Sequence, residues 1–373
     1  MEKIARWRNL IIGKIYQWLL KPIFFRIDPE RIHDAMSALL RISGKFFITR
    51  QITYAFWGYK HPALAQEILG IKFDNPVGLA GGFDKNGKLA DIMPSLGFGF
   101  AEIGSVTGEP CAGNPKPRLW RLKKSRSLVV YYGLKNSGCK IISERLKNKK
   151  FLLPIGINIA KTNCRETVNE AAGVADYFKA YEAFRDIGNF YIINISCPNT
   201  YGGEPFQTGP ALDALLAKIF SIPKTKPVLL KLGADLSEQT VDELLAVAQK
   251  YPVDGFICTN LTKKRDSKNI LDKDVPPLGS LSGKIVAPLS DDLIRYVYKK
   301  TSGKSVIIGT GGIFSAEDAY RKIKAGASLV ELITGMIFEG PQLISDINLG
   351  LVKLLEQDGY KNIGEAIGAE TNH

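Results

Sequence analysis

Residues 191 to 200 read Tyr-Ile-Ile-Asn-Ile-Ser-Cys-Pro-Asn-Thr, a short apolar run that ends in small polar residues. Seven further runs of this kind occur from about residue 70 onward, at 76–80, 100–104, 154–158, 228–231, 255–259, 306–309 and 329–333. Continuous apolar strands are typical of a parallel sheet that is buried on both faces. Helical patterns lie between most of the runs, for example at 237–250 and 316–325. This alternation predicts an α/β protein with a (β/α)8 barrel, also called a TIM barrel.

A doubly wound open sheet is the alternative fold, and it usually has a Gly-x-Gly-x-x-Gly turn after its first strand. The corresponding turn here is Gly81-Gly-Phe-Asp-Lys-Asn-Gly87, which lacks that spacing. The barrel is therefore the preferred prediction. We expect a small helical module at residues 1–45 and a catalytic barrel at residues 46–373.

The composition limits the classes of partner. The net charge of +13 indicates an anionic partner, although a solvated basic surface would give the same value. No finger, RNA-binding or helix-turn-helix signature is present, so nucleic acid is not favoured. Five single cysteines without a Cys-x-x-Cys pair argue against a zinc or iron–sulfur site and fit a reducing compartment.

Residues 3–26, KIARWRNLIIGKIYQWLLKPIFFR, have the pattern of a basic amphipathic helix. Lys14 and Lys21 break the apolar run, so it is too short to span a bilayer. The apolar residues at helical spacing are Trp7, Leu10, Ile11, Ile15, Trp18 and Leu19. This face predicts either an anchor at a membrane surface or a helix packed on the protein's own core.

Pro22 is expected to interrupt this first helix. A second helix is predicted to begin at Asp28-Pro29-Glu30, where an N-cap residue precedes a proline in the first turn, and to run to about Ile42.

The groups that follow each barrel strand converge on one face of the barrel. Here they are mostly carboxamides, lysines, hydroxyls and glycines, with almost no carboxylate and no histidine. That set argues against metal-assisted hydrolysis and against paired-carboxylate glycosidase chemistry. Carboxamides both donate and accept hydrogen bonds, so several of them suit a flat heterocycle. The glycine-rich turns Gly309-Thr-Gly-Gly312 and Thr334-Gly335 suit a phosphate, which together with a flat ring indicates flavin mononucleotide (FMN). Lys231 would lie near the ring, or else form a salt bridge inside the barrel.

Several motifs together resemble the dihydroorotate dehydrogenase family over nearly the whole chain. They are 81–87 GGFDKNG, 102–107 EIGSVT, 113–118 GNPKPR, 195–200 ISCPNT, 281–284 LSGK and 308–313 IGTGGI. The segment Ile27-Asp-Pro-Glu-Arg-Ile-His33 is similar to the membrane-associated, quinone-using class, in which N-terminal helices form an apolar tunnel to the flavin. The resemblance implies flavin-dependent oxidation of dihydroorotate to orotate in pyrimidine biosynthesis. It also implies a quinone acceptor and a peripheral location at the cytoplasmic face of the cell membrane, whose anionic surface the N-terminal helices would contact.

The resemblance also implies residue roles. Cofactor contacts are expected from Ala80, Gly81, Lys85, Ser105, Asn158, Asn194, Lys231, Thr259, Ser282, Gly283, Gly311, Gly312, Ile333 and Thr334. Substrate contacts are expected from Lys85, Asn136, Asn194, Asn199 and Asn260, and the quinone path from His33 and Arg121.

Cys197 is expected to be the catalytic base, with Thr200 as a hydrogen-bonding helper. A free thiol with a pKa near 8.5 reaches its thiolate form near neutral pH. Lys85 or Lys231 would lower that pKa further. A lone cysteine at the end of a strand is also typical of a small buried apolar side chain.

Four features depart from the quinone-using class. Cys197 stands where that class has serine, and Gly202-Gly-Glu-Pro-Phe206 looks more like the soluble class. Val130 aligns with a substrate-binding asparagine, for which Asn136 is a nearby substitute, and Ile333 replaces a tyrosine. The alternatives are therefore a soluble acceptor (fumarate or NAD), a related dihydropyrimidine substrate, or a membrane-surface binding protein on a barrel that has lost its activity.

Overall fold

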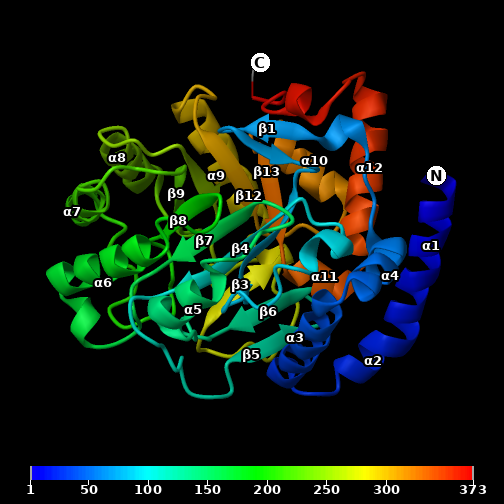
Figure 1. Ribbon diagram of the computed structural model, residues 1–373, viewed down its shortest axis with the longest axis horizontal. Helices are drawn as coiled ribbons and strands as arrows, with labels where there is room; N and C mark the ends of the chain where they lie inside the picture. Colours follow the sequence, from blue (N-terminus) through cyan, green and yellow to red (C-terminus); the bar gives the residue numbers. More distant parts are fainter. Residues whose placement is uncertain (1, 372–373) are drawn as a thin grey trace.

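The computed structural model describes residues 2–371 and contains a closed barrel of eight parallel strands (Figure 1). Neighbouring strands follow the order of the chain, and the last strand pairs with the first. The strands are β3 (Val77–Asp84), β4 (Phe100–Val106), β7 (Ile155–Ile159), β8 (Phe190–Asn194), β9 (Val228–Leu232), β10 (Gly255–Cys258), β12 (Val306–Thr310) and β13 (Leu329–Leu332). Each of the eight predicted runs overlaps one of these strands, so the predicted barrel is confirmed.

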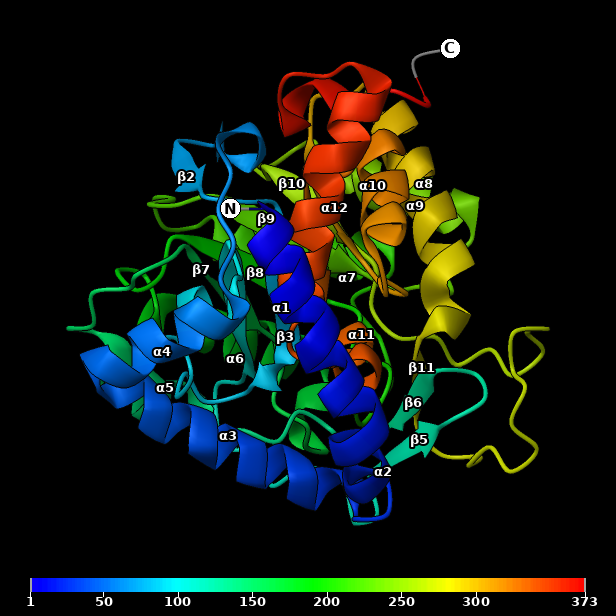
Figure 2. The same ribbon diagram turned by 90° about the vertical axis from the view of Figure 1, so that its right-hand side faces the viewer.

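Helices surround the barrel on its outer side (Figures 1 and 2). They are α5 (Gly138–Leu146), α6 (Glu170–Ala183), α7 (Gly209–Ile219), α8 (Glu238–Ala248), α9 (Ala287–Lys300), α10 (Ala316–Lys324), α11 (Thr334–Glu339) and α12 (Leu343–Asp358). The two helices named from the sequence, α8 and α10, are confirmed. Each begins at a serine N-cap, because the side chains of Ser237 and Ser315 each accept a hydrogen bond from the backbone N–H three residues on.

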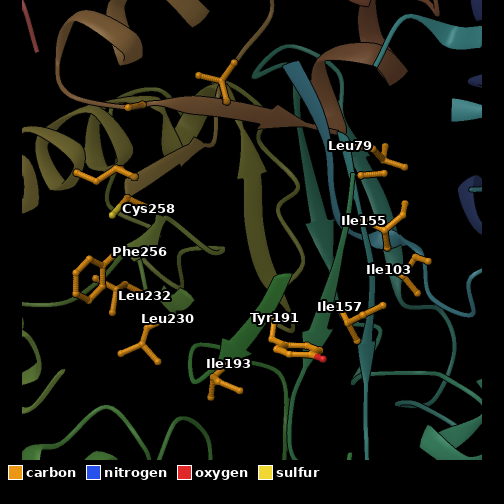
Figure 3. Packing of buried hydrophobic residues seen from close by; sticks show 14 of the residues in the cluster. Leu79, Ile103, Ile155, Ile157, Tyr191, Ile193, Leu230, Leu232, Phe256 and Cys258 are labelled. Carbon is orange, nitrogen blue, oxygen red and sulfur yellow. The ribbon is translucent and has the colours of Figure 1, made fainter. Parts of the chain in front are cut away.

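Alternation along each strand sends side chains to two different cores. Outward-facing residues such as Leu79, Ile103 and Ile157 pack in one large cluster with the surrounding helices (Figure 3). Inward-facing residues such as Phe100 and Ile192 fill the lower part of the barrel. The barrel interior is therefore closed by apolar side chains at one end, which leaves only the carboxyl end for a site.

Two small sheets were not predicted. The hairpin β1 (Gln66–Ile68) and β2 (Ile71–Phe73) lies at the closed end, where Phe73 packs edge-on against Phe100 at 5.7 Å. An antiparallel sheet of β5 (Leu119–Leu122), β6 (Ser127–Val130) and β11 (Ser280–Gly283) lies beside the carboxyl end. Short 3-10 turns complete the chain at 62–64, 93–96, 166–168, 284–286 and 363–366.

The N-terminal helices are α1 (Glu2–Ile15), a π-helical turn (Tyr16–Leu20), α2 (Lys21–Phe24), α3 (Pro29–Lys45) and α4 (Phe47–Trp57). The predicted start of α3 is confirmed, because the Asp28 side chain accepts from the backbone N–H of Arg31 at 2.9 Å. The prediction that Pro22 interrupts the first helix is wrong, since the chain stays helical to Phe24. Pro22 lies in the first turn of α2, where a missing N–H costs little, and the wider π-helical turn precedes it.

Helix α1 docks on α12 through polar side chains, and the two run side by side (Figure 2). Arg8 donates to Ser345 Oγ at 2.8 Å, and Asn9 donates to Asp346 Oδ1 at 2.8 Å. The apolar face of α1 and of the π-helical turn that follows it points the other way. Its residues, with exposed fractions of 49–83%, are Trp7, Leu10, Ile11, Ile15, Trp18 and Leu19. The alternative that this face packs on the protein's own core is therefore excluded.

Exposed apolar side chains are concentrated in this part of the chain. Of the twenty-five large hydrophobic residues exposed within residues 2–371, eighteen lie between Ile4 and Phe56. No helix within residues 2–371 is both long enough and apolar enough to cross a membrane.

Candidate active site

One large cavity, of about 910 Å³, opens at the carboxyl end of the barrel strands and continues between the N-terminal helices α2, α3 and α4. Every residue predicted to contact the cofactor lines it. So do Lys85, Asn199 and Asn260 among the predicted substrate contacts, Cys197, and both predicted quinone residues, His33 and Arg121. The structure therefore brings together almost the whole predicted set, in a single cavity.

A network of amide side chains forms one wall. Asn194 donates to Ser105 Oγ at 3.0 Å and to Asn158 Oδ1 at 3.2 Å. Asn260 donates to the carbonyl oxygen of Ser196 at 2.6 Å. These contacts orient the carboxamides at the ends of β7, β8 and β10, where they can offer donors and acceptors to a flat ring.

Lys231 lies at the floor of the cavity between two glutamates. Its Nζ is 3.3 Å from both carboxylate oxygens of Glu102 and 2.9 Å from Glu331 Oε1. The salt bridge considered for Lys231 is thus present, and the lysine lines the cavity as well. Burial opposes the charge of Lys231, but the acidic side chains of Glu102 and Glu331 outweigh it and raise the pKa of Lys231. Neither glutamate was predicted as a site residue, because the prediction took polar residues at the ends of the apolar runs, whereas Glu102 and Glu331 lie in the middle of the runs 100–104 and 329–333.

Cys197 follows β8 and lines the cavity, where it is only partly buried by the protein. Loss of solvent raises the pKa of its thiol to about 11, which Glu204 reinforces. The backbone N–H of Asn199 and the Lys161 ammonium act in the opposite direction. Burial thus opposes the thiolate that the sequence predicts near neutral pH, and the cation that acts on the thiol is Lys161 rather than Lys85 or Lys231.

Lys161 is a site residue that was not predicted from the sequence. It lies two positions after β7, is buried, and donates from Nζ to the carbonyl oxygen of Tyr201 at 2.8 Å. It thereby holds the loop that follows Cys197. The rule that selected Asn158, a polar residue at the end of a barrel strand, would also have found it.

Two predicted residues are not brought to the cavity. The Thr200 hydroxyl donates to the carbonyl oxygens of Cys197, at 3.2 Å, and Gly203, at 2.8 Å, so it shapes the loop and does not reach the thiol. Asn136 is buried. Its Nδ2 donates to Thr107 Oγ1 at 2.7 Å, and its Oδ1 accepts from the backbone N–H of Gly138 at 2.7 Å. Asn136 therefore does not replace the asparagine expected at position 130, where Val130 lines the cavity.

Lys85 joins the barrel to the N-terminal helices. Its Nζ lies 3.3 Å from His33 Nε2 of α3 and 4.2 Å from the centre of the Tyr132 ring. Burial lowers the pKa of Lys85 to about 8, and burial together with the neighbouring Lys85 lowers the pKa of His33 to about 3. His33 is thus neutral and Lys85 is the cation at the junction of the polar and apolar parts of the cavity.

The apolar part of the cavity is lined by helices α2, α3 and α4. Its lining includes Phe24, Ile32, Met36, Leu40, Ile52 and Phe56. Arg121 lies at its edge, where it donates to the carbonyl oxygen of Ile27 at 2.8 Å and stacks on Phe25 at 4.8 Å. Glu30 anchors α3 to the barrel through a buried bidentate contact with Arg118, whose Nη2 is 2.7 Å from Glu30 Oε1.

The residues present fit a flavin with a phosphate. Arg121 Nε and Tyr132 Oη are buried in the protein, line the cavity, and have no hydrogen-bond partner among the described residues. Gly312 has φ +76°, and an added Cβ would come within 2.3 Å of Ala287 Cβ, so the turn needs glycine. The backbone of this turn, with the hydroxyl pair of Ser282 and Thr334 at 2.8 Å, offers donors to a phosphate.

A parallel barrel with carboxamides and a lysine at its carboxyl end, opening into an apolar passage, defines a class of barrel oxidoreductases that bring a flat cofactor next to an apolar partner. Known proteins identify the family. Residues 63–355 match the family model described as Dihydroorotate dehydrogenase. The chain belongs to the dihydroorotate dehydrogenase family, whose members are in general flavin-dependent.

Similar proteins cover almost the whole chain. A protein of Haloarcula marismortui named dihydroorotate dehydrogenase (quinone) is 42% identical over 94% of this chain and 98% of its own. One of Sulfurovum sp. with the same name is 40% identical over 94% and 97%. The crystal structure of DHODH from Eimeria tenella in complex with ferulenol has a TM-score of 0.84 and 29% identity, over 93% of this chain and 96% of that one.

Proposed function

We propose that this chain oxidises dihydroorotate to orotate in pyrimidine biosynthesis, with FMN as its cofactor and a membrane quinone as electron acceptor. One observation carries the proposal. A single cavity joins the amide and lysine groups at the barrel end to the apolar passage between the N-terminal helices. A polar substrate and an apolar acceptor can therefore reach opposite ends of one cofactor. The curated relatives with 36–42% identity are named as quinone enzymes.

The site residues divide the work as follows. Asn194, Asn199 and Asn260 hold the N–H and C=O groups of the substrate ring, and Lys85 balances its carboxylate. When bound, the flavin supplies the acceptor for the hydride that leaves the substrate. Cys197 takes the proton from the adjacent carbon. Because the Cys197 pKa is raised to about 11, the base is mostly a neutral thiol at pH 7 and the reaction becomes faster as the pH rises.

We place the protein at the cytoplasmic face of the cell membrane, as a peripheral protein. The support is the apolar surface that residues 2–45 expose, together with exposed basic residues of the same segment such as Lys14, Arg41 and Lys45. Helix α4 extends this surface with Phe47 and Ile48. A basic amphipathic surface of this kind binds in the plane of anionic lipid headgroups.

A variant that fills the passage tests the acceptor. Met36→Trp replaces the unbranched methionine side chain of α3 with a bulky indole ring in the lining of the passage. Met36→Leu is the matched control of similar volume. We expect Met36→Trp to reduce quinone turnover while dihydroorotate still reduces the flavin at the normal rate. Equal quinone turnover in both variants would contradict a quinone path through these helices.

A second candidate is the same oxidation with a soluble acceptor, fumarate or NAD. The observations in its favour are Cys197 and the turn at Gly202 and Gly203, which look like the soluble class. Turnover of the full chain with fumarate or NAD but not with a quinone would establish this candidate and remove the first.

A further inference from the structure

A buried layer of three charged residues lies directly beneath the cavity, on three different strands. Glu102 of β4 and Glu331 of β13 are fully buried, at 0% exposure each, and Lys231 of β9 is 4% exposed. Alternation puts all three inside the barrel, one layer above the apolar filling that includes Phe100 and Leu329. Only Lys231 lines the cavity, so the two carboxyl groups are shielded by it.

The charges in this layer do not balance if both carboxyl groups are ionised. One ammonium can neutralise one carboxylate, and an uncompensated buried charge is very costly. The hydrogen bonds show which carboxylate is satisfied. Glu102 accepts from Asn158 Nδ2 at 2.7 Å as well as from Lys231. Glu331 Oε1 accepts a hydrogen bond from Lys231 Nζ at 2.9 Å, whereas Glu331 Oε2 has no donor among the described residues.

Among residues 2–371, Lys231 is the one cation that forms a salt bridge with Glu331. The largest electrostatic effects on Glu331 come from Glu102 and Lys231. On the two neighbouring strands, the residues opposite Glu331 are Thr310 of β12 and Gly78 of β3, neither of which ionises. Burial and the neighbouring Glu102 carboxylate raise the pKa of Glu331 well above its ordinary value.

We propose that Glu331 holds a proton at neutral pH, on Oε2, and donates it to Glu102, so that the layer is neutral as a whole. This proton converts the unpartnered oxygen into a donor and gives two facing carboxyl groups a shared hydrogen bond. Glu331 is then a positioning residue that acts through Lys231, because it leaves the lysine's charge to be matched by Glu102 alone.

The neutral layer has a consequence for the cofactor, which rests on the proposed function. A flavin bound in the cavity that Lys231 lines would gain electrons from the substrate, and a net negative charge in the layer would oppose that gain. The proton on Glu331 removes that opposition. Replacing Glu331 by its neutral isostere should therefore leave the midpoint potential of the bound flavin unchanged at neutral pH. If Glu331 were ionised, removing its charge would raise the potential.

Infrared spectroscopy of the purified holoprotein tests the proton directly and needs no substrate. We expect a carbonyl stretching band of a protonated carboxylic acid at pH 7, shifted in D₂O and absent in Glu331→Gln. Glu365→Gln, at an exposed glutamate, is the control and should keep the band. Persistence of the band in Glu331→Gln, or no such band in the wild type, would overturn the proposal.

A second variant covers the case in which Glu331→Gln fails to fold. In Glu102→Gln, Lys231 has one carboxylate partner left, so Glu331 should ionise and the same band should disappear. A band that survives in Glu102→Gln would place the proton elsewhere. Both results are independent of which substrate or acceptor the protein uses, so failure of the proposed function would not be mistaken for failure of this inference.

Discussion

The pH dependence of substrate oxidation follows from the surroundings of Cys197. Its pKa is raised to about 11, chiefly by burial, so at pH 7 about one molecule in ten thousand has the thiolate. The observed rate of flavin reduction by dihydroorotate should rise about tenfold per pH unit and should not level off below about pH 10. Stopped-flow absorbance of the flavin, at saturating dihydroorotate without oxygen, measures this rate.

Two substitutions distinguish the loss of the base from a disruption of the loop that holds it. Cys197→Ser has a much weaker acid at the same position, so reduction should be slower at every pH and still rising at the highest pH reached. Cys197→Ala removes the base and should reduce the rate by about 10²- to 10⁴-fold. Titration with orotate is the control, because both variants should bind it normally if the loop is intact. A wild-type rate that levels off near pH 7, or a Cys197→Ser variant with an unchanged rate and pH profile, would refute the assignment.

Three further predictions concern the contact between Glu30 and Arg118, the binding of the N-terminal helices to a membrane surface, and the role of Lys85 in substrate binding. Arg118→Gln leaves the Glu30 carboxylate buried without its main partner and should lower the free energy of unfolding by about 3–5 kcal/mol in urea titrations. Lys116→Gln, at an exposed contact to the same carboxylate, should lower it by less than about 1 kcal/mol. Trp18→Gln, where the ring is 83% exposed, should leave stability unchanged but weaken binding to anionic vesicles about tenfold in co-sedimentation. Because Lys85 loses its proton above about pH 8, orotate affinity measured by flavin absorbance should fall about tenfold per pH unit above that value, and Lys85→Met should abolish this dependence.

The barrel could be predicted because its strands are marked by composition. Each is a continuous apolar run that stops at glycine or a small polar residue, and continuous burial is a property of the strand itself. The sheet of β5, β6 and β11 has no such mark. Its strands have four residues each, and β11 pairs with a segment about 150 residues earlier in the chain, at Ser127 to Val130.

The site was predictable where a polar residue ends an apolar run, because the strand then fixes the direction in which that side chain points. That rule brought Asn158, Asn194 and Lys231 together correctly. It missed Glu102 and Glu331, although a charged residue inside an otherwise apolar strand signals a polar layer within the barrel.

Other outcomes depend on contacts that no local pattern contains. The Asn136 amide is used by Thr107 and the neighbouring backbone, and the Thr200 hydroxyl is turned to backbone carbonyls by the Gly202–Gly203 turn. The pKa of Cys197 depends on burial by the folded chain, so a thiol that looks available in the sequence is a weak acid in the structure.

Anaerobic mixing of the purified protein with dihydroorotate, followed by addition of a quinone, is the most direct test of the proposed substrate and acceptor. We expect dihydroorotate to bleach the flavin absorbance and the quinone to restore it, and we expect no recovery with fumarate or NAD. Flavin that stays oxidised in the presence of dihydroorotate would contradict the proposed substrate. Recovery of the absorbance with fumarate or NAD alone would contradict the proposed acceptor.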